Sequence, residues 1–420
     1  MINELLSFII IYKVYSTIIK LNFSKQNQTF SNNDSINFEL LHKSNILTNI
    51  TIGTPPKTIK AYIQFKYFEY YIIDNKTNPD FYSKDSSSTF FPKPKEPIEF
   101  IDSPFLYGYY TTETFIFNNI LNQEEKIENL PTIIGIDLNI KFPSYLGFNF
   151  YLDTEEYHHK SLIQELRRTK KISEIFSFEF LNKNEGQIII GGFPHFYNKK
   201  YNEKDLKWNQ IKLEYPDMSW NIFFNKILFD NEKFNGSTVC YLEYELDLIY
   251  APNEYKNKFL EFNSKNDNKC KEIIEQYKYS FFVCDKSISF KYFPKIIFYS
   301  NELDYSFELN YEDLFKEING KLYLLIEFNY NLKNFDKWRL GVPFLKKYKF
   351  IFDYSNKKIG FYSNKNSNNR FLLILIIIVF LVIIICLLVI IYNIKIIKRR
   401  KRKNEIEEYY DYISETKFFN

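Results

Sequence analysis

The 420-residue chain has only 11 glycines, 4 cysteines and 4 histidines. This scarcity excludes several kinds of chemistry. The histidines, His42, His158, His159 and His195, do not have the spacing of a metal-ligand set. The chain also lacks a nucleophile elbow, a P-loop and a dinucleotide fingerprint. Its net charge is only +4, which provides no overall field to attract nucleic acid. We therefore expect no metal, no cofactor and no nucleic-acid partner.

Apolar and aromatic residues are abundant instead. They include 35 Tyr and 44 Phe, which is ample material for a large, strand-rich core. At 50.9 kDa the chain is long enough for two globular units plus extensions. Short β-branched and aromatic runs alternate with Pro, Gly, Asn and Asp from residue 49 to residue 362. This pattern predicts an all-β body with few helices, of which the clearest are residues 160–169 and 311–318.

One long run, residues 371–392, carries no charge and has no polar face, which predicts a single transmembrane helix. A polar linker at residues 364–370 precedes it. The basic cluster after the run places residues 393–420 in the cytoplasm by the positive-inside rule. The rest of the chain is then lumenal or extracellular, in the secretory pathway or at the cell surface. In the tail, Tyr410 and Ile413 match a tyrosine-based sorting signal, which docks as an extended strand.

The N-terminus has an apolar stretch and predicts a signal peptide at residues 1–22, followed by a leader at residues 23–45. Glu4 and Lys13 are unusual in a signal peptide, so a signal anchor is the alternative. Six glycosylation sequons precede the predicted span, at Asn22, Asn27, Asn33, Asn49, Asn75 and Asn235. The five that follow the signal peptide are candidate glycosylation sites.

Two cysteines flank a short polar segment and form our candidate disulfide, Cys270–Cys284. Closing a loop of this length would stabilise the fold by about 3 kcal/mol in the chain-entropy model. Cys240 is then left as a buried thiol in a core strand, and Cys386 lies within the predicted span.

Several motifs resemble those of pepsin-family aspartic proteases and occur in the order of that family. They are the Gly-Thr-Pro-Pro turn at 53–56, the serine-rich turn at 86–90, the strand at 144–148, the runs at 176–180 and 186–192, and the C-terminal pattern at 338–362. The resemblance implies a two-lobed, all-β pepsin-like fold. It places the N-terminal lobe at residues 46–200 and the C-terminal lobe at residues 201–363.

The same resemblance locates the two catalytic triplets, which are Asp-Thr-Gly in the family. Counting from the flanking motifs places Gln64-Phe65-Lys66 at the first triplet and Glu243-Tyr244-Glu245 at the second. Family members share one proton between two aspartates. A glutamine cannot ionise, and the extra methylene of Glu243 shifts its carboxyl by about 1.5 Å. No intact catalytic pair is therefore expected.

Other family positions have changed as well. Lys66 and Glu245 replace the glycines that allow a close backbone approach beneath the carboxyls. Ile101 and Asp102 stand where the Tyr-Gly of the substrate-covering flap is expected, and Val342 stands where an Asp follows Leu-Gly. These independent departures predict a remodelled cleft.

We therefore expect a degenerate peptidase homologue, anchored by one membrane span, that binds a peptide or protein in the cleft between the lobes. The aromatics Tyr67, Phe68, Tyr70 and Tyr71 either line this groove or fill the core. The main alternative is an active aspartic endopeptidase that pairs Glu243 with another acid. Asp74 and Asp247 are the nearest candidates, although both have the character of solvated turn residues. A structural coat protein is the third alternative.

Overall fold

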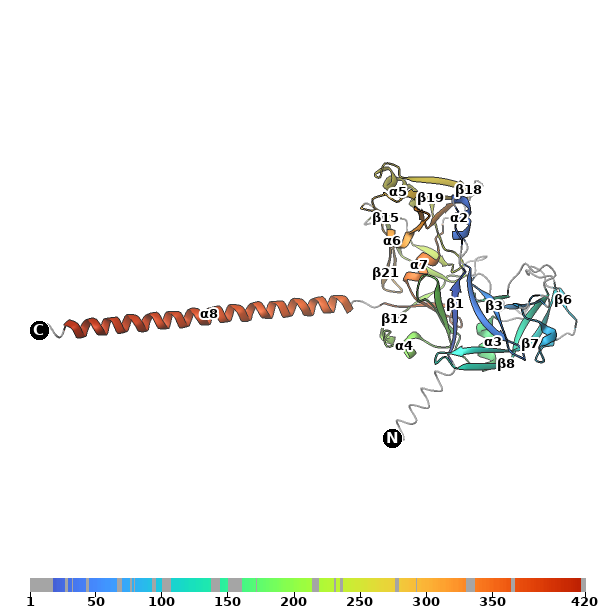
Figure 1. The fold of residues 1–420 in the computed structure, drawn as a ribbon, viewed down its shortest axis with the longest axis horizontal. Coiled ribbons are helices and arrows are strands. Elements are labelled where there is room, and N and C mark those ends of the chain that lie inside the picture. The colour runs from blue at the N-terminus through green and yellow to red at the C-terminus, as the bar shows by residue number, and fades with distance from the viewer. Residues whose placement is uncertain are drawn as a thin grey trace, which may run out of the picture. The chain divides into compact units, whose positions relative to one another are not determined.

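The computed structural model describes residues 18–26, 29–31, 33–42, 45–65, 70–75, 78, 80–92, 96–99, 107–136, 144–149, 161–170, 172–213, 219–229, 232–234, 237–275, 279–291, 293–329, 337–363 and 367–416. The chain forms two compact units, Met1–Ser363 and Asn364–Asn420 (Figure 1). The first unit is built almost entirely of strands and the second of one helix. The predicted β-rich body is therefore confirmed.

The largest sheet has 14 strands and joins segments from both ends of the first unit. In spatial order its path runs through β12 (Leu206–Gln210), β27 (Lys358–Tyr362), β26 (Phe350–Asp353), β10 (Ile175–Phe180), β11 (Glu185–Ile190), β1 (Ile19–Lys25), β2 (Ile46–Ile52), β3 (Lys57–Gln64), β9 (Ser144–Gly147), β4 (Tyr71–Asp74), β8 (Glu124–Ile136), β7 (Tyr107–Asn119) and β5 (Phe91–Pro92), with β6 (Ile98–Glu99) paired to β7. The C-terminal strands β26 and β27 thus extend the sheet of the N-terminal half, so the sheet crosses the lobe boundary predicted at residue 200.

Two smaller sheets form the other half. The nine-stranded sheet contains β13 (Asn221–Phe224), β16 (Thr238–Leu242), β25 (Arg339–Leu340), β17 (Ile249–Ala251), β24 (Ile326–Asn329), β19 (Tyr279–Asp285), β23 (Lys321–Leu324) and β22 (Phe315–Ile318), with β18 (Cys270–Glu275) paired to β19. The four-stranded sheet contains β15 (Glu232–Phe234), β14 (Lys226–Phe229), β20 (Ile296–Ser300) and β21 (Tyr305–Leu309). Among the described strands, β13 and β22 lie at the two ends of the path of the nine-stranded sheet.

Short helices cover these sheets. They are α2 (Asp34–His42), α3 (Leu162–Lys170), α4 (Pro194–Tyr197), α5 (Asn253–Ser264), α6 (Tyr311–Leu314) and α7 (Val342–Lys347), with 3-10 turns η1 (Lys84–Ser86) and η2 (Glu203–Asp205). Helix α3 confirms the helix predicted at residues 160–169, and it buries Leu162, Ile163 and Leu166 on one face. Helix α5 buries Tyr255, Phe259 and Phe262 at the i, i+4, i+7 spacing of an amphipathic helix.

The second predicted helix, at residues 311–318, is wrong in its C-terminal half. Asn310 caps α6 by accepting hydrogen bonds from the N–H groups of Glu312 and Asp313, but the helix ends at Leu314. The chain then forms a hairpin of β22 and β23. Asn319 and Gly320 connect these strands with φ of 50° and 78°, a left-handed pair that favours a tight hairpin turn. Pairing with β23 therefore outweighs local helix propensity.

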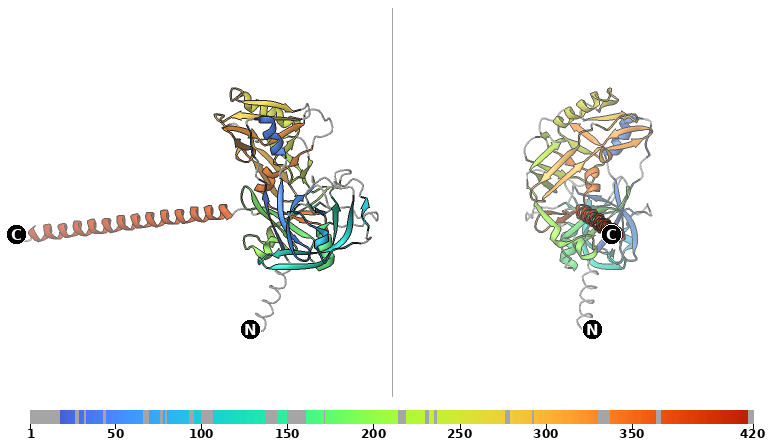
Figure 2. Two further views of the ribbon diagram at one scale, coloured as in Figure 1. Left: turned by 45° about the vertical axis from the view of Figure 1, so that its right-hand side comes forward. Right: turned by 90° about the vertical axis from the view of Figure 1, so that its left-hand side faces the viewer.

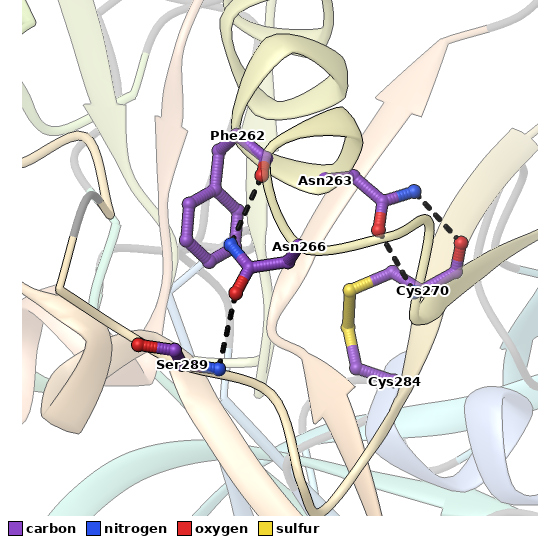
Figure 3. Close-up of a disulfide and its surroundings, with 6 residues drawn as sticks. All are labelled: Phe262, Asn263, Asn266, Cys270, Cys284 and Ser289. Atoms are coloured by element: carbon purple, nitrogen blue, oxygen red, sulfur yellow. Dashed lines mark hydrogen bonds between the residues drawn. A yellow bond between two sulfur atoms is a disulfide. The ribbon is translucent and has the colours of Figure 1, made fainter.

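The predicted disulfide is confirmed between Cys270 and Cys284 (Figure 3). The two cysteines are direct partners across β18 and β19. The side chain of Asn263 in α5 forms two hydrogen bonds with the backbone of Cys270. It accepts from the Cys270 N–H and donates to the Cys270 carbonyl. Helix α5 is thereby tied to the disulfide-linked hairpin.

Residues predicted as the end of the signal peptide and the leader are part of the fold. Strand β1 begins at Ile19 and pairs with β11, β2 and β7, so a boundary at residue 22 would divide it. Helix α2 lies within the predicted leader. Although it is near the N-terminus, it packs among the C-terminal strands (Figure 2). Ile18 and Ile19 are buried in the fold. A signal peptidase that leaves this core intact would therefore cleave before residue 18.

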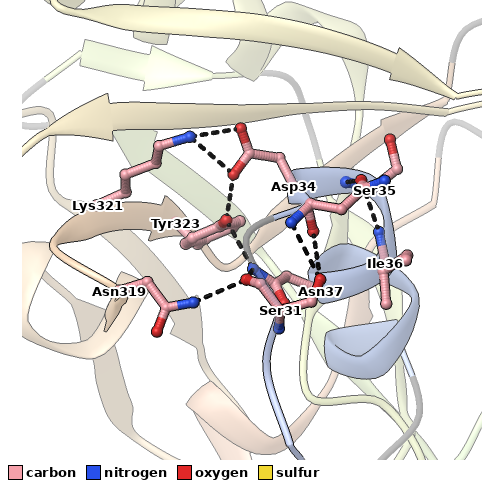
Figure 4. A network of polar contacts seen from close by, with 9 residues as sticks. Ser31, Asp34, Ser35, Ile36, Asn37, Asn319, Lys321 and Tyr323 are labelled. Carbon is pink, nitrogen blue, oxygen red and sulfur yellow. Dashed lines mark hydrogen bonds and ion pairs between the residues drawn. The ribbon is translucent and has the colours of Figure 1, made fainter.

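Polar contacts anchor α2 and the residues before it to β23 and its turn (Figure 4). Asp34 forms an ion pair with Lys321 at 2.8 Å and accepts a hydrogen bond from the Tyr323 hydroxyl. Asn37 donates to that hydroxyl at 3.0 Å, and Asn319 donates to the carbonyl of Ser31 at 2.7 Å. Partial burial opposes a lower pKa at Asp34, but the Lys321 ammonium and the Tyr323 hydroxyl hold this pKa below its usual value.

The second unit consists of α8 (Ser367–Thr416). Its stretch Ile377–Asn404 is long and apolar enough to cross a membrane. The helix already includes Ser367, so most of the predicted linker is helical. It also continues to Thr416, so Tyr410 and Ile413 are helical rather than extended. A sorting signal that docks as a strand would require the end of α8 to unwind.

Candidate functional site: the two degenerate triplets

The first triplet lies at the end of β3. Gln64 pairs in parallel with Gly147 of β9, and its carbonyl accepts from the N–H of Phe148 at 2.7 Å. Gln64 is half-buried, whereas Phe65 is only 2% exposed. Lys66 and the flap positions Ile101 and Asp102 lie outside the described residues. Strand β3 therefore ends on an amide residue at the position predicted for the first catalytic aspartate.

The second triplet forms the turn between β16 and β17. The N–H of Glu243 donates to the carbonyl of Leu340 at 3.1 Å, so the turn starts against β25. Gly341 lets the next backbone approach closely, because a Cβ there would lie 2.0 Å from the carbonyl oxygen of Leu248. Val342, at the family's Asp position, is buried and its N–H donates to the carbonyl of Leu246 at 2.7 Å. The surroundings of this turn are therefore tightly packed.

The structure brings the two triplets together, although they lie far apart in the sequence. The rings of Phe65 and Tyr244, the middle residues, have centroids 4.2 Å apart. The carboxylate of Glu245 accepts a hydrogen bond from the backbone N–H of Phe65. From the sequence, Glu245 was expected only to replace a glycine of the second triplet. In the structure its carboxylate links the two turns.

Glu243 has a cationic partner that was not anticipated from the sequence. A guanidinium nitrogen of Arg339 lies 2.6 Å from its carboxylate oxygen. Arg339 reaches this position because β25 pairs in parallel with β16, with Tyr241 opposite Arg339. The only sequence signal would have been a basic residue just before the Leu340-Gly341 pair of the family pattern. The carboxylate at the position predicted for the second catalytic aspartate is thus held in an ion pair.

Aromatic side chains fill the space around the paired turns. Tyr244 also packs on Phe178, with ring centroids 4.1 Å apart, and Phe65 packs on Phe148 at 5.7 Å. Tyr244 is 1% exposed, and its hydroxyl has no hydrogen-bond partner among the residues described. Burial raises the pKa of this hydroxyl well above its usual value. The two turns therefore meet in a buried aromatic core.

The predicted groove aromatics also belong to the core where they are described. Tyr70 is 1% exposed and donates its hydroxyl hydrogen bond to the carbonyl of Pro131. Tyr71 is 8% exposed and packs on Tyr145, with ring centroids 5.0 Å apart. These two rings are therefore unavailable to line a groove, while Tyr67 and Phe68 lie outside the described residues.

The two substitute acids were expected to be solvated turn residues, and this expectation is wrong. Asp74 is buried and forms an ion pair with Lys84 at 2.8 Å. Asp247 is buried and forms an ion pair with Lys25 of β1. Both carboxylates are occupied by lysines rather than positioned to share a proton with Glu243.

The predicted glycosylation sites differ in exposure. Asn22, Asn33 and Asn49 are exposed, whereas Asn27 and Asn235 lie outside the described residues. Asn75 is 7% exposed, and its side-chain oxygen accepts from the N–H of Asn78. A glycan has no room at this position, so Asn75 is removed from the candidate sites.

This geometry can be compared with the chemistry of the pepsin-like class. Proton sharing requires two carboxyl groups at close range. The described site instead presents the Gln64 amide at one position and an ion-paired glutamate at the other. As in that class, two turns from opposite halves of the chain meet at the site. Here the ring contact between Phe65 and Tyr244 and the hydrogen bond from the Phe65 N–H to the Glu245 carboxylate hold the turns together.

Comparison with known proteins gives the family directly. The sequence model of the eukaryotic aspartyl protease family matches residues 46–364, and the chain belongs to that family. The chain is similar to pregnancy-associated glycoprotein 2 of Bos taurus, at 25% identity over 325 residues, covering 74% of this chain and 80% of the relative. It is also similar to plasmepsin VII of Plasmodium berghei (strain Anka), at 26% identity over 267 residues, covering 57% of this chain and 55% of the relative.

Solved structures support the predicted fold. Basic 7S globulin from soybean and conglutin gamma from lupine seeds each align with a TM-score of 0.58 at 12% identity. The first alignment covers 82% of this chain and 94% of the globulin, and the second covers 83% and 95%. At this identity the likeness concerns the fold alone. Together with the family match, it confirms the two-lobed pepsin-like fold.

Proposed function

We propose that this chain is a membrane-anchored, catalytically degenerate member of the aspartyl protease family that binds a peptide or protein instead of cleaving it. The observation that carries the proposal is the ion pair between Glu243 and Arg339 opposite the non-ionisable Gln64. The described residues of the first triplet, Gln64 and Phe65, supply no carboxyl that could share a proton with Glu243. The aromatic packing of Phe65 against Tyr244 supports the same reading, because it fills space beneath the cleft.

A binding role does not need an acid-base pair. An extended peptide can add as a strand to an exposed sheet edge and use main-chain hydrogen bonds for affinity. The ligand of the proposed cleft is therefore a peptide segment in extended conformation. Saturable retention of particular peptides by the micelle-embedded chain would separate this role from that of a structural coat protein, which would retain none.

Proteolysis is expected to be absent. The full chain, incubated in detergent micelles with a peptide library from pH 3 to 7, should release products at the same rate as its Glu243→Gln variant, because neither has a proton-sharing pair. Mass spectrometry of the products measures this rate. Glu124→Gln, a matched change at an exposed site, controls for the loss of one carboxylate. Pepstatin-sensitive cleavage that disappears in Glu243→Gln but persists in Glu124→Gln would instead establish the active endopeptidase.

We also propose a type I orientation, with residues 393–420 in the cytoplasm. It is supported by the apolar stretch of α8 and the basic residues that follow it. On expression in a secretory system, Asn33→Gln and Asn49→Gln should each remove one glycan, seen as a step in gel mobility. Asn75→Gln should change nothing, because Asn75 is buried. Unchanged mobility in all three variants, with a glycosidase-resistant parent, would contradict this orientation.

A further inference from the structure

A cavity of about 700 Å³ lies beside the turn that carries the second triplet, with Asp247 and Val342 in its lining. Its walls come from the end of β1, the β10–β11 turn, the segment around α2, strand β22 and helix α7. Among its described lining residues are Lys25, Lys183, Lys316 and Lys346, and we call it the lysine cavity. The described residues of the two triplets do not line it.

The lysine cavity has more cations than acids available to pair with them. Its acidic lining residues are Asp247, Glu312, Asp313 and Glu317. Three of these are already paired, Asp247 with Lys25, Asp313 with Lys347, and Glu317 with Lys286 from outside the cavity. Glu312 is exposed and accepts a hydrogen bond from the Tyr311 hydroxyl. Within the described part of the chain, Lys183, Lys316 and Lys346 form no ion pair.

The unpaired lysines are close enough to affect one another. Partial burial lowers the pKa of Lys316, the Asp247 carboxylate opposes this shift, and the charges of Lys25 and then Lys346 lower the pKa further. Desolvation, Lys25 and Lys183 likewise lower the pKa of Lys346. An anion entering the cavity would relieve this repulsion.

The remaining walls define the shape of the ligand. Three consecutive residues of β22, Phe315 to Glu317, line the cavity, although successive side chains of a strand point to opposite faces. The lining therefore follows the edge of β22, which is an outer strand of its sheet in the described chain. Apolar side chains also line it, and the Phe30 ring lies 4.6 Å from the ammonium of Lys316.

We propose that the lysine cavity binds an extended acidic peptide segment of a partner protein, with carboxylates at Lys316 and Lys346 and apolar side chains against the apolar walls. A strand added at the edge of β22 would direct every second side chain to one side, about 7 Å apart. This spacing suits a peptide that alternates acidic and apolar residues. The proposal does not depend on the proposed loss of hydrolysis.

The test uses the full chain in micelles of an uncharged detergent. The probe is a hexapeptide alternating Glu and Leu that carries a neutral fluorophore, and its binding is followed by fluorescence anisotropy. We expect Lys316→Gln/Lys346→Gln to raise the Kd at least tenfold. Lys204→Gln/Lys207→Gln removes the same charge at exposed positions outside the cavity and should change the Kd less than twofold. Unchanged tryptophan fluorescence would verify that both variants remain folded.

Three outcomes would overturn the proposal. Equal losses in the two double variants would mean nonspecific attraction. Equal binding of a peptide with Gln in place of Glu would mean that charge is not recognised. Displacement of the probe by inorganic phosphate at the peptide's own concentration would mean a small-anion site. A charge swap gives a positive check, because Lys316→Glu/Lys346→Glu should prefer a peptide alternating Lys and Leu.

Discussion

Replacing Tyr244 with alanine is expected to lower the free energy of unfolding of the first unit by about 3–5 kcal/mol. The ring is 1% exposed and packs on Phe65 and Phe178 at 4.2 and 4.1 Å, so its removal leaves a cavity where the two triplets meet. The measurement is the urea midpoint of the full chain in micelles. All three tryptophans, Trp208, Trp220 and Trp338, precede α8, so their fluorescence reports only on this unit.

The matched control is Tyr244→Phe. It keeps the ring and removes a buried hydroxyl without a hydrogen-bond partner among the described residues. Because such a hydroxyl is desolvated without compensation, this variant should be neutral or more stable by about 1 kcal/mol. A large loss in both variants would show that the hydroxyl has an essential partner. A negligible loss of unfolding free energy in Tyr244→Ala would show that the meeting of the two turns does not depend on the packed rings of Phe65 and Tyr244.

The second large effect is expected at Glu327, a buried carboxyl in β24. Its side chain is 0% exposed. Tyr250 lies opposite on β17, and the His42 ring nitrogen Nε2, at 3.5 Å, is within ion-pair distance if protonated. Burial raises the pKa of Glu327 from 4.5 to about 8, and the Tyr250 hydroxyl offsets only part of this shift.

The sign of the pH effect follows from this raised pKa. Between pH 4.5 and 8 the folded chain holds a proton on Glu327 that the unfolded chain releases, so stability falls as pH rises through this window. The penalty is near zero below pH 4.5, about 3 kcal/mol at pH 7, and close to 5 kcal/mol above pH 8. Glu327→Gln abolishes the titration and should raise the free energy of unfolding by these amounts.

Urea midpoints of wild type and Glu327→Gln at pH 5 and pH 8 measure this difference. Glu124→Gln, at an exposed site, controls for the loss of a carboxylate and should follow the wild type at both pH values. A gain from Glu327→Gln that is equal at pH 5 and pH 8 would mean that Glu327 is already ionised at the lower pH, in an ion pair with protonated His42. The raised pKa would then be wrong.

Much of the fold could be predicted because it depends on local patterns. The apolar face of α3, the disulfide between Cys270 and Cys284, and the charge-free run in α8 are all visible in short segments. Strand β22 was missed because its helix-compatible residues were read without the Asn319-Gly320 turn that pairs it with β23. Strand β1 was missed because its apolar residues were taken for the end of a signal peptide.

Much of the candidate site could not be predicted for a different reason. The partner of Glu243 is Arg339, 96 residues away, and the partner of Asp247 is Lys25, 222 residues away. Nothing in the sequence around either acid distinguishes a paired buried carboxylate from a solvated one. The burial of Asn75 likewise depends on packing rather than on its sequon.

The sequence alone determined the motifs that resemble the aspartyl protease family, and counting from them predicted Gln64 and Glu243 at the two catalytic positions. It also determined the strand-rich body and the apolar run that could cross a membrane. Only the tertiary structure decided that the rings of Phe65 and Tyr244 pack together, that Arg339 binds Glu243, and that unpaired lysines gather around one cavity. Periodicity and turn chemistry act over a few residues, whereas ion pairs and ring contacts depend on how the whole chain folds back on itself.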